Sequence, residues 1–245
     1  MHYFFLENQS LGSGLAVSLK NGDISHAHRV LRIKKNEVVA ISDGFGNVHK
    51  GIVVISSPKE VTIELGEKLL PAESPLKITI AQGLVKGDKF DLIVRQAVEL
   101  GVVRIQPLLT ERSVPHRSRQ QEEKRLQRWR SIARSAAAQC RRAFLPAVED
   151  VIKLKEYLHQ AEMETIITPW EGERAVPLSS LLKQPSPEKG TVTIIIGPEG
   201  GLTEREIELL NKTGAITVHL GLRILRSETA SSTVIALVQS AWGDL

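Results

Sequence analysis

The stretch TIIIGPEGGLTERE, residues 193–206, joins an apolar run, a glycine-rich turn and the start of a helix. Ile194–Ile196 form the run, and Thr203 followed three residues later by Glu206 is the capping-box pattern that begins a helix. A strand that leads through glycines into a helix N-terminus is a common anion-binding site. Glu199, however, places a carboxylate in the middle of this turn, where it would repel a phosphate.

The motifs that cradle nucleotide phosphates are missing from the sequence. The turn matches neither GxGxxG nor GxxxxGK[ST], and GLVKGDK, residues 83–89, has the wrong spacing for the second motif. A glycine turn that carries a carboxylate suits a ligand with hydroxyl groups, an adenine edge or positive charge. The turn therefore argues against nucleotide diphosphates and triphosphates, and it leaves several other ligands open.

The alternation of strand and helix continues on both sides of this stretch. A helix is predicted over 88–100 with Gly101 as its stop, a long basic helix from about 120 to 142, and another from about Ser227. Apolar strands are predicted over 76–82, 102–108, 163–170, 191–197 and 215–221. Strands that alternate with helices predict an α/β fold, a mostly parallel sheet with helices on both faces.

The first seventy residues follow a different pattern. Short β segments are predicted at 38–42, 51–56 and 61–65, separated by turns, and this spacing is typical of a small barrel or sandwich. The sequence thus predicts a β domain over residues 1–70, a linker over 71–75 and an α/β domain over 76–245.

Parallel sheets bind ligands outside the carboxyl ends of their strands. Three segments of this chain lie just past such ends: TPWEGE (168–173), GPEGGLT (197–203) and LGLRILRSETA (220–230). We therefore expect them to converge in space. Each polar residue also has a structural interpretation: Glu228 can serve as a first-turn helix acid, and Trp170 can cap the core rather than stack on a ligand.

The net charge of +4 over 245 residues hides a strong local excess. Residues 112–142 contain ten Lys or Arg and two acids, which gives this segment a charge of +8 and leaves −4 for the rest of the chain. Such a concentration is typical of a surface that binds a polyanion, with RNA or DNA the first candidates. A solvated helix face is the alternative.

Cysteine and histidine usage argues against a metal enzyme. Cys140 is the only cysteine, which excludes an intramolecular disulfide and a zinc site of several thiolates, and the seven histidines are scattered. Basic neighbours make Cys140 a candidate nucleophile, although a small packed residue is the simpler interpretation. The N-terminus has no secretory leader pattern and no run reaches the length of a membrane span, so we expect a cytoplasmic protein.

Six motifs together resemble a known family. They are HAHRVLRIKKNE (26–37), DGFGN (43–47), KGDKFDLIVRQAVELGV (86–102), PLLTERS (107–113), GPEGGLTEREIE (197–208) and LGLRILRSETASSTVIAL (220–237). In this order they resemble the bacterial 16S rRNA (uracil-N3)-methyltransferases, the RsmE-type members of the SPOUT superfamily. The resemblance covers essentially the whole chain.

The resemblance implies an N-terminal PUA-like β-barrel that docks RNA, and a C-terminal domain whose last strands and helix thread a trefoil knot. It also implies a homodimer and an S-adenosylmethionine pocket formed by the knot. Carried onto this sequence, the cofactor-binding residues would be Thr168, Pro169, Trp170, Glu171, Ile196, Gly197, Pro198, Glu199, Gly200, Gly201, Leu220, Gly221, Leu222, Ile224, Leu225, Arg226, Glu228 and Thr229. These residues belong to the three segments that strand topology selects.

The same resemblance gives expectations for catalysis and for RNA binding. Uracil N3 is a poor nucleophile until it loses its proton, so Arg226 or Arg223 is expected to hold the uracil oxygens and stabilise the developing negative charge. Glu228 is expected to orient that arginine or to accept the proton. Residues expected to contact the substrate RNA are Arg112, Ser113, Arg117, Arg119, Arg128, Gln139 and Arg142.

Two other functions remain open at this stage. One is a SPOUT methyltransferase that acts on tRNA or on a ribose 2′-hydroxyl. The other is a ribosome-assembly factor that binds RNA and has lost catalysis. The preferred substrate is 16S rRNA, free or in an assembled small ribosomal subunit, with no metal and no membrane involved.

Overall fold

A computed structural model describes residues 1–6, 9, 11–71, 73–113, 119–160 and 165–245. The chain divides into two compact units: the first contains Met1–Glu73 and Arg134–Leu145, and the second contains Ser74–Ala133 and Pro146–Leu245. These bounds differ from the expected division, because a segment far along the chain returns to the first unit. No helix in the described ranges is long and apolar enough to cross a membrane.

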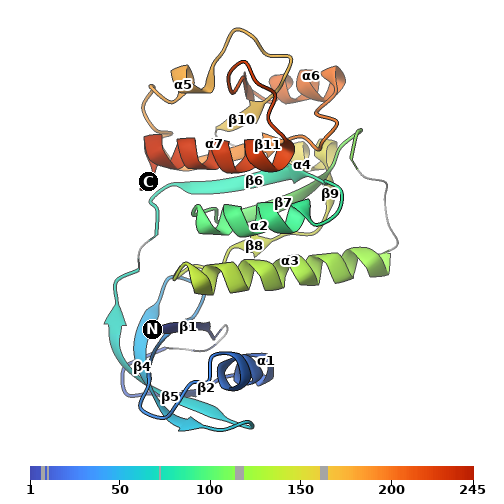
Figure 1. The fold of residues 1–245 in the computed structure, drawn as a ribbon. Helices are drawn as coiled ribbons and strands as arrows, with labels where there is room; N and C mark the ends of the chain where they lie inside the picture. Colours follow the sequence, from blue (N-terminus) through green and yellow to red (C-terminus); the bar gives the residue numbers. More distant parts are fainter. Residues whose placement is uncertain (7–8, 10, 72, 114–118, 161–164) are drawn as a thin grey trace. The chain divides into compact units, whose positions relative to one another are not determined.

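The first unit is built on a five-stranded sheet in the order β1-β3-β4-β5-β2 (Figure 1). Its strands are β1 (His2–Phe5), β2 (Ala16–Ser18), β3 (Val38–Ser42), β4 (Val48–Ser56) and β5 (Val61–Leu69). β1 pairs with β3 in parallel, and the other pairings are antiparallel. Of the strands described here, β1 and β2 form the two edges and do not pair with each other.

A short helical segment crosses the first unit between β2 and β3. The helix α1 (Asn21–Ser25) continues directly into a π-helical turn, η1 (His26–Val30), from which Ala27 is fully buried. Apolar side chains from the strands and from this segment form one core that includes Phe4, Leu6, Ile24, Ile41 and Ile63. The sequence predicted the three central strands but not α1, η1, β1 or β2.

Arginines attach residues 134–145 to the first unit. Arg134 donates to the carbonyl of Phe5 at 2.5 Å and to Asp23 at 3.0 Å. Arg142 is only 5% exposed and pairs with Glu73 at 2.9 Å. Both acids lie far away in the sequence, which is why the domain bounds could not be read from composition.

The second unit contains a seven-stranded sheet, and every pairing in it is parallel. Six strands follow the order β12-β10-β11-β6-β7-β8, and β9 also pairs with β7. Their bounds are β6 (Lys77–Gly83), β7 (Arg104–Leu109), β8 (Ala147–Val148), β9 (Ile152–Lys153), β10 (Ile166–Pro169), β11 (Thr191–Ile196) and β12 (Ile216–Val218). The predicted mostly parallel sheet is confirmed.

Helices cover both faces of this sheet (Figure 1). On one face α4 (Leu154–Gln160) and α6 (Glu204–Lys212) pack against Ala81, Leu108 and Ile195. On the other face α2 (Lys89–Glu99) packs against α7 (Ser227–Trp242), and α7 also contacts β6 and β11. The strands are apolar on both sides because both sides are buried. A single turn, α5 (Leu178–Leu181), follows β10.

The basic helix α3 (Arg119–Gln139) ends three residues before the expected position. Arg141 has a φ of 62°, in the left-handed region, so the helix cannot continue through it. The first part of α3 belongs to the second unit, where the Trp129 ring lies 4.1 Å from that of Phe90 and its Nε1 donates to Asp91 at 3.1 Å.

The capping box predicted at the start of α6 is confirmed. The Thr203 hydroxyl accepts from the Glu206 amide, and Glu206 Oε2 accepts from the Thr203 amide at 2.9 Å. Glu206 is buried, and its other oxygen accepts from the Glu111 amide at 2.8 Å. One carboxylate therefore fixes both the helix start and the loop after β7.

We expect Glu206→Ala to lower the free energy of unfolding of the second unit by about 2 kcal/mol, because it leaves the partly buried amides of Glu111 and Thr203 without an acceptor. Urea unfolding followed by tryptophan fluorescence measures this unit, since Trp129, Trp170 and Trp242 all belong to it. Glu208→Ala removes an exposed carboxylate from the same helix and should change stability by less than about 0.5 kcal/mol. Equal losses in both variants would contradict the role of Glu206.

Candidate functional site

A cavity of about 420 Å³ lies in the second unit, past the carboxyl ends of β10, β11 and β12. This volume falls in the range of pockets that hold small molecules. The structure brings the three selected segments together around it. Its lining comprises Lys89, Pro169, Trp170, Glu171, Arg174, Ile196, Gly197, Pro198, Glu199, Gly201, Leu202, His219, Leu220, Gly221, Leu222, Arg223, Ile224, Leu225, Arg226, Ser227 and Ala230.

Four residues expected to touch a cofactor do not line this cavity. Thr168 is fully buried at the end of β10, and Gly200, Glu228 and Thr229 lie outside the lining. Three lining residues lie outside the selected segments, namely Lys89, Arg174 and His219, and three more, Leu202, Ser227 and Ala230, lie within them but were not assigned to the cofactor. Ser227 and Ala230 line the cavity because α7 begins there. Lys89 and Arg174 resemble ordinary exposed cations in the sequence.

The turn after β11 needs its glycines for close packing. A Cβ on Gly197 would lie 2.9 Å from the carbonyl carbon of Gly201. Gly201 has a φ of +70°, and a Cβ there would lie 2.4 Å from an oxygen of Glu171. Larger residues would therefore displace the backbone or the Glu171 carboxylate, so the glycines bring one wall of the cavity close to another.

Glu199 braces this turn. Its Oε1 accepts from the Lys86 amide at 3.0 Å and lies 3.2 Å from Lys89 Nζ. Burial raises the pKa of Glu199, but the hydrogen bonds from Lys86 and Lys89 outweigh it, and the net pKa is lowered. The carboxylate is therefore held ionised at the edge of the cavity, where it favours positive charge.

A buried glutamine joins the turn to the first turn of α7. The Gln82 amide nitrogen donates to Ser227 Oγ at 3.0 Å and to the Gly197 carbonyl at 3.3 Å, and its oxygen accepts from Ser231 at 2.5 Å. Ser227 Oγ in turn donates to the Gly197 carbonyl at 2.7 Å. This network links β6, the turn after β11 and α7, and sequence reasoning missed it.

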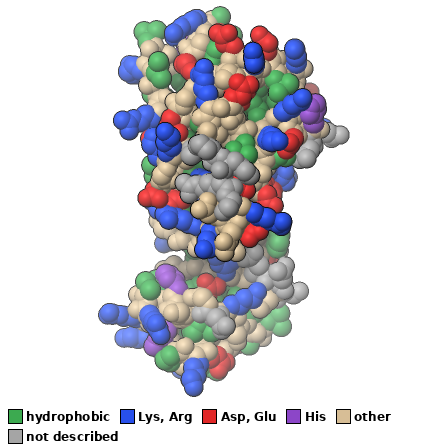
Figure 2. Space-filling view, turned by 90° about the vertical axis from the view of Figure 1, so that its right-hand side faces the viewer, with side chains coloured by type: hydrophobic (Ala, Val, Ile, Leu, Met, Phe, Trp, Pro, Cys, Tyr) green, Lys and Arg blue, Asp and Glu red, His purple; other side chains and the backbone are tan. Residues whose placement is uncertain are grey.

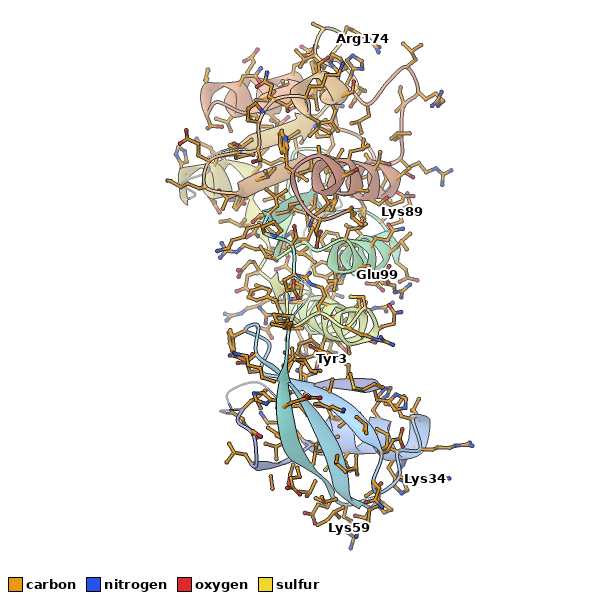
Figure 3. The ribbon with its side chains drawn as sticks, turned by 90° about the vertical axis from the view of Figure 1, so that its left-hand side faces the viewer. Tyr3, Lys34, Lys59, Lys89, Glu99 and Arg174 are labelled. Carbon is orange, nitrogen blue, oxygen red and sulfur yellow. The ribbon has the colours of Figure 1, made fainter. Side chains whose placement is uncertain are left out.

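The loop after β10 forms the opposite wall. The Trp170 ring covers Gly172, lines the cavity and also packs on the core under α4 and α6. Glu173 accepts hydrogen bonds from the Ala175, Val176 and Arg174 amides, which lower its pKa and shape the loop that presents Arg174. Figure 3 shows Arg174 on this loop, at one end of the second unit.

The segment between β12 and α7 completes the cavity. Gly221 has a φ of +106° and its amide donates to His219 Nδ1 at 3.2 Å. Arg223 and Arg226 are exposed and line the cavity. The apolar side chains of Leu222 and Ile224 are also largely exposed, at 96% and 82%.

Two buried polar atoms near the cavity are unsatisfied in the part of the chain that the structure describes. Glu228 Oε2 and Thr168 Oγ1 have no hydrogen-bond partner there. The other oxygen of Glu228 lies 3.7 Å from Lys89 Nζ. A buried carboxylate oxygen without a donor is costly unless a water, an ion or a ligand reaches it, so Glu228 is a candidate functional group.

Comparison with known proteins decides the family. Residues 72–239 match the model of the RNA methyltransferase domain. The chain is 30% identical to ribosomal RNA small subunit methyltransferase E of Bacillus subtilis over 94% of this chain and 93% of that protein. The Aquifex aeolicus enzyme of the same name is also 30% identical, over 98% and 100%. The chain belongs to the ribosomal RNA small subunit methyltransferase E family.

A solved structure of a family member has the same fold over its whole length. The Neisseria gonorrhoeae ribosomal RNA small subunit methyltransferase E, solved with S-adenosylmethionine bound, aligns with a TM-score of 0.91 at 34% identity and covers 100% of this chain and 99% of that one. A Legionella pneumophila methyltransferase structure, also with bound cofactor, aligns at 0.89 and 28% identity, over 99% and 98%.

The residues that the family resemblance assigns to RNA differ in their surroundings within each unit. Arg112 donates to the Gly200 carbonyl at 2.7 Å, which places it beside the cavity turn, and Ser113 hydrogen-bonds within its own loop. Arg119 is exposed and pairs with Glu123, whereas Arg128 pairs with Asp88 and Asp91. Arg128 thus also anchors α3 to the start of α2.

The remaining assignments lie in the first unit or outside the described residues. Gln139 is exposed, but Arg142 is buried and paired with Glu73, so its guanidinium has a structural role in this unit. Arg117 lies outside the described residues. Cys140 is half-buried, its thiol directed to the Ala137 carbonyl at 3.7 Å, and it does not line the cavity. The described ranges contain no cluster of three metal-ligand side chains.

The lowered pKa of Glu199 gives a pH-dependent prediction. Its contribution to stability is present above the ordinary value of about 4.5 and is lost as the pH falls through the lower folded value. We therefore expect Glu199→Gln to destabilise the protein most at neutral pH, and the difference from the wild type to shrink below about pH 4. Urea unfolding at pH 7, 5 and 3.5 measures it, with Glu208→Gln as the control. A difference that grows toward acid pH would refute the proposed bracing.

Proposed function

We propose that this protein is an S-adenosylmethionine-dependent methyltransferase that methylates N3 of a specific uridine in 16S rRNA of the small ribosomal subunit. The observation that carries the proposal is the cavity at three adjacent strand ends, in a chain that matches cofactor-bound relatives end to end. Such a substrate would place the reaction in the cytoplasm.

The cavity suits the proposed cofactor chemically. Its apolar lining, which includes Ile196, Leu202 and Ala230, fits an adenine ring, and Trp170 offers an aromatic face. Glu171 and Glu199 supply carboxylates that favour ribose hydroxyls and positive charge and disfavour phosphate. The cofactor residues are proposed from the three converging segments, with Arg174 and His219 added.

When bound, S-adenosylmethionine supplies an electrophilic methyl group whose transfer leaves a neutral thioether. The chain must hold the base in line with that methyl group and favour the deprotonated form of N3. Arg226 and Arg223 are proposed to hold the uracil oxygens and to stabilise the negative charge. Glu228 is proposed to accept the N3 proton as the bond from N3 to the methyl carbon forms, or to orient Arg226.

RNA binding is proposed to use both units. In the second unit Arg112, Ser113, Arg119 and Arg128 are the proposed contacts, with Gln139 from the first; Arg142, buried against Glu73, is proposed to support this part of the first unit and not to touch RNA. Figure 2 shows Lys and Arg side chains gathered with His side chains on one edge of the first unit. Exposed cations of this unit include Lys20, Arg29, Arg32, Lys34 and Lys35. Phosphate contacts of this kind position an RNA without reading its sequence.

The finer fold assignments belong to the same proposal. We propose that the first unit is a PUA-like barrel, which is supported by its mixed, mostly antiparallel five-stranded sheet. We also propose a trefoil knot in the second unit. In its support, the chain leaves the edge strand β12 and returns to the centre of the sheet, where Ser227 bonds to Gln82 and Gly197.

The proposed activity is tested with rRNA from a strain that lacks the homologous enzyme. Free 16S rRNA and purified small subunits are incubated with labelled cofactor, and mass mapping locates the modified nucleoside. The proposal expects one N3-methyluridine. Methylation of tRNA or of a ribose hydroxyl would indicate the other enzyme class, and RNA binding with no calorimetric signal for the cofactor would indicate a non-catalytic assembly factor.

The proposed role of Arg226 predicts a selective loss of turnover. We expect Arg226→Ala to lower kcat/KM for RNA by about 10²–10³-fold, as removal of a transition-state charge donor does. The Kd for S-adenosylmethionine should stay within about threefold, measured by calorimetry. Arg205→Ala, an exposed arginine on α6, is the control and should retain full activity. Loss of cofactor affinity in Arg226→Ala would mean that this arginine binds the cofactor instead.

We also propose a homodimer, because Leu222 and Ile224 expose two large apolar side chains beside the cavity. Sedimentation should give twice the chain mass of 27.0 kDa for the wild type and a shift toward the single-chain mass for Ile224→Asp. Leu70→Asp changes an equally exposed apolar residue in the first unit and should leave the dimer intact. A monomeric wild type would overturn this part of the proposal.

A further inference from the structure

Lys89 lies between two carboxylates that come from different elements of the second unit. Its Nζ is 3.2 Å from Glu199 Oε1, on the turn after β11, and 3.7 Å from Glu228 Oε1, in the first turn of α7. Lys89 itself is the first residue of α2. One ammonium group thus joins three elements that are separate in the sequence, and Figure 3 shows it between α2 and α7.

The start of α2 is fixed from its other side. Phe90 packs against Trp129, and Asp91 accepts from Trp129 Nε1 and pairs with Arg128. The two residues after Lys89 are therefore buried against α3, and the backbone that carries Lys89 has little freedom to shift. A lysine on an anchored backbone can hold its partners in place, whereas a lysine on a loose loop would follow them.

The two carboxylates depend unequally on Lys89. Glu199 also accepts from the Lys86 amide, so it keeps one partner without the lysine. Glu228 is only 13% exposed, and within the described ranges Lys89 is the one cation at ion-pair distance from it. Without Lys89, a mostly buried carboxylate would lose its partner and would tend to move.

We propose that Lys89 is a positioning residue for methyl transfer, which holds Glu228, the proposed proton acceptor, in place at the start of α7. This inference rests on the proposed function. Lys89 acts through Glu228, because its ammonium group already lies against two carboxylates. Through Lys89 the turn after β11 is also linked to α7. Glu228, the proposed proton acceptor, is therefore held in position relative to Glu199 at the cavity.

The test compares Lys89→Met and Lys89→Arg in the full-length protein, each alone and combined with Glu228→Gln. We expect Lys89→Met to lower kcat by at least about tenfold while the Kd for S-adenosylmethionine changes less than about threefold. Lys89→Arg restores a cation and should recover most of kcat. In the Glu228→Gln background Lys89→Met should add less than about twofold, because residues that act as a unit are not additive.

Control variants distinguish a positioning role of Lys89 from a general loss of folded structure. Lys77→Met removes an exposed lysine at the start of β6, the end of that strand away from Gln82, and should keep wild-type kinetics. Tryptophan fluorescence checks folding, and Lys89→Gln, with the same expected kinetics, replaces Lys89→Met if the latter does not fold. An active wild type with an unchanged kcat in Lys89→Met, or an equal loss in both Glu228 backgrounds, would overturn the inference. A loss of cofactor affinity alone would also overturn it, and a wild type inactive on rRNA would overturn the proposed function as well.

Discussion

The site depends on the hydrogen bonds of one buried amide. Gln82 is fully buried, and its side chain bonds to the turn after β11 and to two serines of α7. An unsatisfied buried amide costs about 1–3 kcal/mol, so these partners stay together once the strand has formed. Because Ser227 is held at Gly197, residues 219–226 must fold back over the strand ends, and there they close the cavity.

Around the hydrogen bonds of Gln82, the acidic side chains and the lysines that pair with them come from different elements. Glu171 lies against Gly201, and Glu199 is bound by Lys86 and Lys89. Glu228, which lies outside the lining, is paired with Lys89. The acids that face the cavity therefore have fixed positions, which suits a ligand with fixed positive and hydroxyl groups. Arg223 and Arg226 remain exposed in the segment between β12 and α7, where the proposed base with its electronegative oxygens can approach them.

Local patterns predicted those parts of the fold that short-range rules control. The strand–turn–helix at 193–206, its capping box and the parallel sheet follow from periodicity and from the side chains of neighbouring residues. The sequence did not predict β8 and β9, since each has only two residues and no alternation can be read from so short a run. Lys89 was missed for a different reason. A lysine at a helix start looks solvated until the fold brings Glu228 beside it.

The basic segment shows how much of a local charge excess is paired within the chain itself. Ten cations lie within residues 112–142, but several of those that the structure describes pair with acids distant in the sequence, among them Asp23, Glu73, Asp88 and Asp150. A phosphate that approaches Arg128 or Arg130 must compete with a carboxylate already in place, and the pairing keeps the guanidinium in one position. Paired arginines attract a distant phosphate less strongly than the same number of unpaired arginines would. Their guanidinium groups are held in fixed positions, so they orient a phosphate that comes close. The paired arginines of this segment therefore attach α3 and the residues after it to neighbouring elements. Its exposed members, Arg112 and Lys124 among them, are better placed to attract a polyanion.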